Sequence, residues 1–247
     1  MAMNTLRLSY GPLLLLLYQA APVNVQTDSL GRYRIGVGYA AGQWENEEFS
    51  CDGQLLSATP VKHHSVGVQV DAWPDKQIRI TGFGGVTRST AGTTVATDPG
   101  YSSPFIDLYD GTFGGALIAY EGRKAGIGIG PTRLPGAGGL RTAFYLRVGN
   151  LDAAHLRMDV MTPNPAFPSV GWGRIGIGFN EGHLRRVGGF MGVGFGPPDY
   201  SSKAAFIGEL NVPVVRHLTA QLHALGGPGE NATQWNLGAA LRFDFGR

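Results

Sequence analysis

The chain has 247 residues, of which 39 are glycine and only 15% are charged, whereas an ordinary soluble domain has about 25% charged residues. A hydrophobic content of 43% with a formal net charge of +2 excludes a disordered chain, and a mean hydropathy of −0.03 excludes a bundle of membrane helices. Glycine costs about 1 kcal/mol per helix position relative to alanine, so an all-β chain remains. The single cysteine, Cys51, excludes a scaffold held by intramolecular disulfides.

The amino terminus has the pattern of an export signal. A short segment with Arg7 precedes an apolar stretch that contains the run Leu13–Leu17, and small residues follow at Ala20 and Ala21. This apolar stretch suits a signal peptide and is too short to span a membrane. The alternative is an uncleaved N-terminal helix. We expect a signal peptide at 1–21, a short N-terminal segment at 22–31 and a single domain at 32–247.

From Arg32 onward, apolar residues recur at every second position, which is the signature of β-strands. In the first run, Ile35, Val37 and Tyr39 share one face. The segment Phe105–Tyr120 is weaker and loses its phase midway. The twelve predicted strands lie in Arg34–Ala40, Val66–Ala72, Ile78–Thr81, Phe105–Tyr120, Lys124–Ile129, Phe144–Val148, His155–Val160, Arg174–Phe179, Arg186–Val193, Phe206–Val212, Leu218–His223 and Gln234–Phe245.

The predicted connections alternate strictly between short and long. A soluble sandwich or lipocalin has no reason to alternate in this way, whereas a membrane barrel has long loops on one membrane face and short turns on the other. Tight turns are predicted around Pro74-Asp75, Glu121-Gly122, Asn150-Leu151-Asp152, Glu181-Gly182 and Arg216-His217. Longer loops are predicted at Gln43–Lys62, Arg88–Pro104, Pro131–Leu140, Thr162–Val170, Gly196–Ser202 and Gly226–Ala232.

The chemistry of the two strand faces agrees with a membrane barrel. One face of nearly every strand is apolar and almost free of charge, while the other carries Arg, Asp, Gln and Gly. A closed barrel of twelve strands is too wide to be filled by inward Ile and Val, so the apolar face is expected outside. Aromatic residues at both ends of this face are typical of membrane interfaces. They are Tyr39, Phe195, Phe206 and Trp235 near the long loops, and Phe179, Phe243 and Phe245 near the tight turns.

On these features, residues 32–247 resemble the bacterial outer-membrane β-barrel proteins. The signal-like start, the even strand count, the loop asymmetry and the last strand LGAALRFDF carry the resemblance. It implies an all-β, closed, antiparallel up-and-down transmembrane barrel of about 12 strands (range 10–12) in the bacterial outer membrane, with both termini in the periplasm. It also implies insertion by the barrel-assembly machinery and contact with membrane lipids and lipopolysaccharide. No nucleic-acid partner is expected.

Candidate catalytic and metal sites are few. The only His/Ser cluster in a predicted strand is His63-His64-Ser65, and adjacent strand residues point to opposite faces. His217 and His223 share a face but lie roughly 20 Å apart along a strand, too far for a shared zinc ion. The runs GIGIGP and GVGFGP lack the following helix that a dinucleotide site needs. We therefore expect no enzyme, metal or cofactor, and we retain an outer-membrane lipid hydrolase as an alternative.

Charged side chains on the polar face are the best functional lead. By parity, eight basic and four acidic residues point into the lumen, an excess of four positive charges. A basic, narrow pore concentrates anions and excludes cations, which predicts a small passive channel that favours small anionic solutes. The alternative is a plug of salt bridges in a non-conducting structural or surface-binding barrel. The predicted lumen residues are Arg34, Arg79, Lys124, Arg147, Arg157, Arg174, Arg186, Arg242, Asp71, Asp159, Glu209 and Asp244.

Overall fold

The computed structural model describes residues 33–96, 110–135, 139–160, 173–181, 186–195, 204–228 and 234–245; the predicted signal peptide and the segment at 22–31 lie outside them. No helix long and apolar enough to cross a membrane occurs in these ranges. The strands are β1 (Tyr33–Phe49), β2 (Leu55–Asp75), β3 (Ile78–Ala91), β4 (Val95–Ala96), β5 (Gly111–Glu121), β6 (Ala125–Arg133), β7 (Arg141–Gly149), β8 (His155–Val160), β9 (Gly173–Phe179), β10 (Gly188–Phe195), β11 (Ala205–Val215), β12 (Leu218–Gly227) and β13 (Gln234–Phe245).

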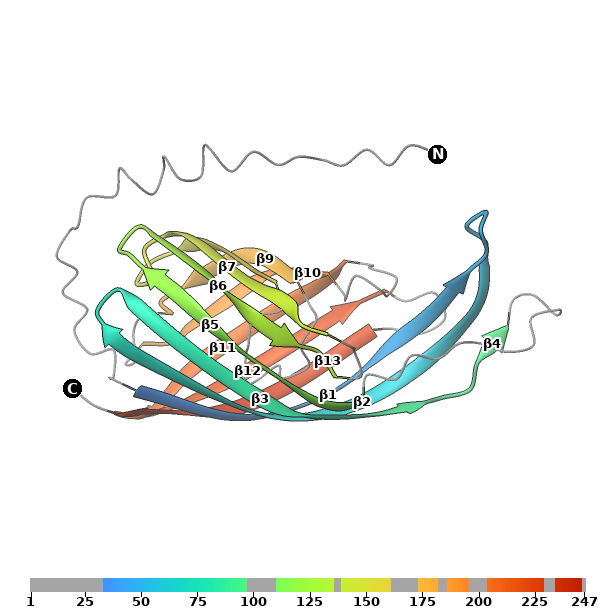
Figure 1. The fold of residues 1–247 in the computed structure, drawn as a ribbon, viewed down its shortest axis with the longest axis horizontal. Helices are drawn as coiled ribbons and strands as arrows, with labels where there is room; N and C mark the ends of the chain where they lie inside the picture. The colour runs from blue at the N-terminus through green and yellow to red at the C-terminus, as the bar shows by residue number, and fades with distance from the viewer. Residues whose placement is uncertain are drawn as a thin grey trace.

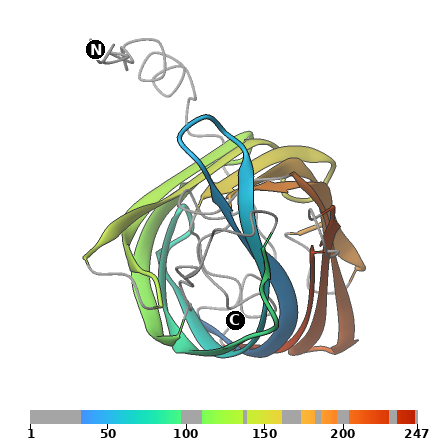
Figure 2. The ribbon, with the colours of Figure 1, turned by 90° about the vertical axis from the view of Figure 1, so that its right-hand side faces the viewer.

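Twelve of these strands close into one antiparallel barrel (Figure 1). Each strand pairs with its neighbours in chain order, and β1 closes the ring by pairing with both β2 and β13, as the end view in Figure 2 shows. Tyr33 lies opposite both Phe245 and Ala72, so the start of β1 and the end of β13 lie at the end of the barrel that carries the tight turns. We call this end the turn end and the opposite one the loop end. The prediction of a closed, all-β, antiparallel barrel of about twelve strands is confirmed.

Alternation of exposure along the strands shows which face lies outside. In β2, Val66, Val68 and Val70 are 41–52% exposed, whereas Gln69 and Asp71 between and beside them are buried. The same alternation runs through the other barrel strands, so the outer surface is an almost continuous apolar belt. Exposure of such a belt to water would be unfavourable, whereas contact with the hydrocarbon core of a bilayer is compatible with its apolar side chains.

The first predicted loop is wrong, because Gln43–Lys62 is mostly strand. β1 continues to Phe49 and β2 begins at Leu55, so the two strands form a long hairpin that projects beyond the rest of the loop end (Figure 1). The register shifts between Glu48 and Phe49, and β4 pairs with the outer part of β2. Sequence alternation misses this hairpin because its residues are mixed and acidic, and only the pairing of one strand with the other holds them extended.

The weak fourth predicted strand keeps its phase. β5 begins at Gly111, and Phe113, Leu117 and Ala119 on one face are all buried. These residues point into the barrel, so the apparent loss of phase reflects apolar residues on the inner face. The predicted residues at 105–109 lie outside the described ranges. Two apolar clusters therefore line the interior: one of Phe113, Leu117, Ala119, Leu134, Ala143 and Tyr145, and one of Phe190, Ala205, Ile207 and Leu225.

A charge on the outer apolar belt is expected to destabilise the barrel according to its depth in the membrane. Val68→Arg lies between two exposed valines of β2 and should lower the free energy of unfolding by about 2–4 kcal/mol. Val214→Arg, near the turn-end boundary of β11, is the matched control and should cost about 0–1 kcal/mol. Urea titration of the chain folded in lipid vesicles measures both, and equal costs would contradict the membrane orientation of this face.

Candidate functional site

Ten of the twelve predicted lumen charges lie buried or half-buried inside the barrel. The other two, Lys124 and Arg186, are exposed and lie outside the strands, just before β6 and β10. Both were assigned by extending strand parity into a connecting segment, where the alternation no longer holds. The ten interior residues are Arg34, Asp71, Arg79, Arg147, Arg157, Asp159, Arg174, Glu209, Arg242 and Asp244.

Two acidic residues that the sequence placed in turns belong to the same interior cluster. Glu121, at the end of β5, and Glu181, just after β9, have side chains only 8% and 9% exposed. With them, the cluster holds six arginines and six carboxylates. The predicted excess of four positive charges is therefore not found among the described arginines, aspartates and glutamates of the interior.

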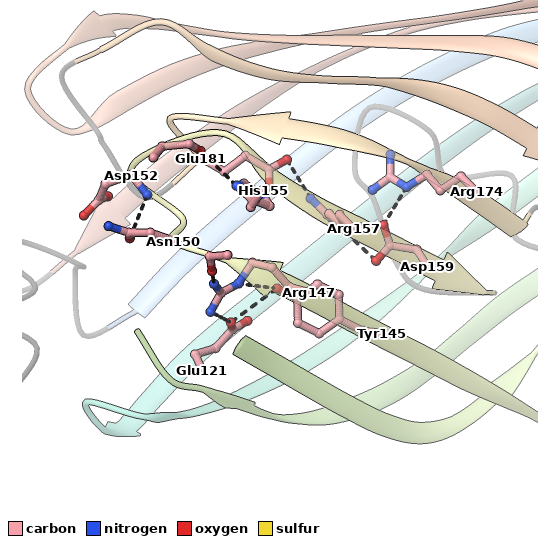
Figure 3. Close-up of polar contacts among 12 residues, drawn as sticks. Glu121, Tyr145, Arg147, Asn150, Asp152, His155, Arg157, Asp159, Arg174 and Glu181 are labelled. Atoms are coloured by element: carbon pink, nitrogen blue, oxygen red, sulfur yellow. Dashed lines mark hydrogen bonds and ion pairs between the residues drawn. The ribbon is translucent and has the colours of Figure 1, made fainter. Parts of the chain in front are cut away.

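Arg147 is the centre of the first part of this cluster (Figure 3). Its side chain is 0% exposed, and its guanidinium lies 3.4 Å from the Glu121 carboxylate and donates to the Gly122 carbonyl at 2.6 Å, to the Gly149 carbonyl and to the Tyr145 hydroxyl. Arg79 pairs with Glu121 at 3.0 Å from the other side. Arg147 therefore fixes two turn-end backbone segments to a shared carboxylate, and a buried charge with this many partners is stable.

A second chain of contacts runs across β8, β9, β11 and β12 (Figure 3 shows its first part). Glu181 accepts from the His155 ring at 3.0 Å and from Arg157 at 2.8 Å, and Arg157 also pairs with Asp159 at 2.7 Å. Burial alone would raise the pKa of the Glu181 carboxyl, but Arg157 and the His155 hydrogen bond hold that pKa below its ordinary value. Thus the turn after β9 is tied to the inner wall by charge.

The same chain continues through Arg174. Its guanidinium donates to Asp159 at 2.7 Å and to Glu209, and Glu209 in turn lies 3.2 Å from Nδ1 of His223. Carboxylates and guanidinium groups thus alternate along this chain of contacts. Each buried charge in this chain of contacts therefore lies next to a charge of opposite sign, which compensates for its burial.

A third group lies at the barrel seam near the turn end. Arg34 pairs with Asp244 at 2.5 Å, and Asp71 accepts from Thr81 at 2.6 Å. A cavity of about 20 Å³ separates this group from the turn after β9, which leaves room for about one water. It is lined by Arg34, Asn180, Glu181, Asn211, Thr219, Arg242 and Asp244.

Aromatic rings fill the space between the arginines. Arg79 and Arg157, from separate parts of the wall, both lie over the Tyr145 ring, at 5.3 Å and 5.5 Å from its centre. Arg174 lies 4.8 Å from the centre of the Phe190 ring. Cation–π contacts of this kind add attraction without adding negative charge, so they hold neighbouring arginines close together inside the barrel.

Inward-facing glycines make room for this network. A side-chain carbon added at Gly178 would lie 2.4 Å from Nε2 of His155, and one added at Gly126 would lie 2.7 Å from the Glu121 carboxylate. At Gly176 it would lie 2.8 Å from the Phe190 ring. At Gly178 and Gly126, the space left by glycine is occupied by side chains of the cluster, whereas at Gly176 the nearest atoms are the Met191 carbonyl and the Gly192 backbone.

The predicted His/Ser cluster is divided between the two faces. His63 and Ser65 point inward, where His63 contacts Asn236 at 2.7 Å and Ser65 contacts Thr87 at 2.9 Å, whereas His64 is exposed outside. The other two histidines considered as metal ligands also lie apart: His217 is exposed in a turn, and His223 is buried and contacts Glu209. In the described ranges, no group of three or more His, Cys, Asp or Glu residues could hold a metal ion.

The interface aromatics lie on the outer face wherever the structure describes them. Phe206 is the most exposed, at 79%, and Phe179 is half-buried. Phe195 is the last residue of β10. The remaining four, Tyr39, Trp235, Phe243 and Phe245, are 38–49% exposed.

No protein-family model matches the sequence, and no curated protein matches it. Among solved structures, the chain is similar to the transport unit of the autotransporter AIDA-I from Escherichia coli, with 9% identity, a TM-score of 0.42 and coverage of 97% of this chain and 98% of that one. It is also similar to OprB from Pseudomonas putida in its low-pH structure, with 11% identity, a TM-score of 0.30 and coverage of 87% and 93%.

Gly178→Ala is expected to lower the free energy of unfolding by about 1–3 kcal/mol, because the added methyl group overlaps the His155 ring. Gly208→Ala is the matched control: it lies on the outer face of β11, where nothing lies within 4 Å of the added carbon. It should leave stability unchanged or raise it by up to about 1 kcal/mol. Urea titration in vesicles compares the two, and an equal loss would show that the interior beside Gly178 is not packed.

Proposed function

We propose that this outer-membrane-type barrel is a non-conducting structural or surface-binding protein whose lumen is closed near the turn end by its own charged side chains. The turn end faces the periplasm with both termini, and the loop end, with the long hairpin of β1 and β2, faces the outside. Long loops at one end and tight turns at the other support this orientation.

The observation that carries the proposal is the pairing of the interior charges. Five arginines and five carboxylates form ion pairs across the inner wall, and the turn-end cavity beside them has room for about one water. In a conducting pore, charged side chains interact with the ions that pass through, whereas these side chains are already paired with one another. The geometry therefore favours a plug over the anion-favouring channel that parity suggested.

The small anion channel is the second candidate, and Arg242 favours it. Among the described residues, none forms an ion pair within 4.0 Å with the Arg242 guanidinium, although Asp244 lines the same cavity. Arg242, beside the seam, is where an anion would bind if the lumen conducts.

Planar-bilayer recordings separate the two candidates. The refolded chain should give no single-channel steps, because the paired side chains block the turn end. A quadruple variant, Arg157→Ser with Arg174→Ser, Glu181→Ser and Glu209→Ser, removes two charges of each sign and should give steps. The matched control replaces the exposed Lys76, Arg123 and Lys124 by Ser and should remain silent.

Anion-selective steps from the unmodified chain would reject the plug and favour the channel. Heat-modifiable gel mobility of each protein shows that its barrel is folded before the recording.

A further inference from the structure

The outer face of β2 and β3 changes abruptly from apolar to basic at the loop end. Val66 and Val86 lie opposite each other and are 52% and 42% exposed. One step further along the same face, His64 lies opposite Arg88, and both are exposed. Lys62 follows two residues beyond His64 and is also exposed. We call Lys62, His64 and Arg88 the basic patch.

The register places the three basic side chains within reach of one small anion. Directly opposed residues such as His64 and Arg88 have Cβ atoms about 4.5–5.5 Å apart, and Lys62 follows on the same face about 7 Å along the strand. Gln43 and Thr90, which lie opposite Lys62 on either side, are uncharged. The patch is therefore a compact triangle on the outer surface.

Among the residues that the structure describes, Asp110 and Glu45 are the acidic residues to consider beside this patch. Asp110 is a loose partner of Arg88 at 3.8 Å, and the Arg88 side chain is still 78% exposed. Glu45, two residues beyond Gln43 along β1, is only 2% exposed. Arg88 therefore keeps guanidinium N–H groups available for another anion.

The Tyr39 side chain holds the His64 ring. Its hydroxyl lies 2.6 Å from Nδ1 of His64, and the two rings stack with their centres 6.1 Å apart. When the hydroxyl donates to Nδ1, the ring proton of a neutral His64 lies on Nε2. Nε2 then carries an N–H that can donate to an anion bound at the patch.

We propose that the basic patch binds the phosphate group of an anionic lipid in the loop-end leaflet. The patch begins where the apolar belt ends, which is the depth of the lipid headgroups when the belt lies in hydrocarbon. An arginine, a lysine and a histidine N–H supply charge-assisted donors to one phosphate. This inference rests on the membrane placement in the proposed function.

The test uses the full chain, refolded in neutral detergent micelles and titrated with phosphatidic acid, with bound lipid counted by native mass spectrometry. The triple variant Lys62→Gln/His64→Gln/Arg88→Gln should bind phosphatidic acid at least about tenfold more weakly. Arg88→Gln alone should bind about fivefold more weakly and serves as a second variant that changes one surface side chain. The matched control, Lys76→Gln/Arg123→Gln/Lys124→Gln, removes three exposed charges at the turn end and should bind like the unmodified chain.

Phosphatidylcholine, in which choline cancels the phosphate charge, should bind weakly and equally to all variants. Inorganic phosphate at the same concentration should not displace phosphatidic acid. Equal binding by the triple variant and the unmodified chain would overturn the proposal, and so would displacement by inorganic phosphate, which would indicate a soluble anion as ligand. Failure of the unmodified chain to insert into vesicles would instead overturn the membrane placement.

Discussion

Closure of the sheet through β1 is the constraint on which the rest of the structure depends. Because β1 pairs with β2 on one side and β13 on the other, no barrel edge is left unpaired, and every barrel strand has one inner and one outer face. In the proposed membrane placement the outer face meets lipid, which favours apolar side chains there. The inner face carries most of the charges of the barrel strands, and these charges need partners within the barrel.

In the interior, arginines and carboxylates form ion pairs with one another. Arg147 and Arg174 each contact a carboxylate, and Tyr145 lies beneath two further arginines. Glycine supplies the space, since Gly126 and Gly178 lie against cluster side chains. Glycines on the inner face therefore leave room for the few charged side chains that are buried beside them.

Most of the fold could be predicted from the sequence, because period-two alternation is a local signal that closure does not alter. The twelve barrel strands were all found, while the hairpin beyond Gln43 was missed because only the pairing of β1 with β2 keeps it extended. The balance of interior charge was not predictable in the same way. Glu121 belongs to the cluster from the end of β5 and Glu181 from the turn after β9, although strand alternation does not place them there. Lys124 lies in the turn before β6 and is exposed, although strand alternation predicts that it points inward. Alternation predicts the direction of a side chain only within a strand, whereas the shape of the turn sets the direction of these side chains.

The central claim is that the interior charges stabilise one another, and a double-mutant cycle between Arg157 and Glu181 tests it most directly. Their side chains lie 2.8 Å apart and join β8 to the turn after β9. The cycle compares Arg157→Met, Glu181→Gln and the double variant by urea unfolding in lipid vesicles. We expect a coupling free energy of at least about 1.5 kcal/mol, as for close, desolvated charge pairs. A coupling free energy below about 0.5 kcal/mol would contradict a paired, closed lumen.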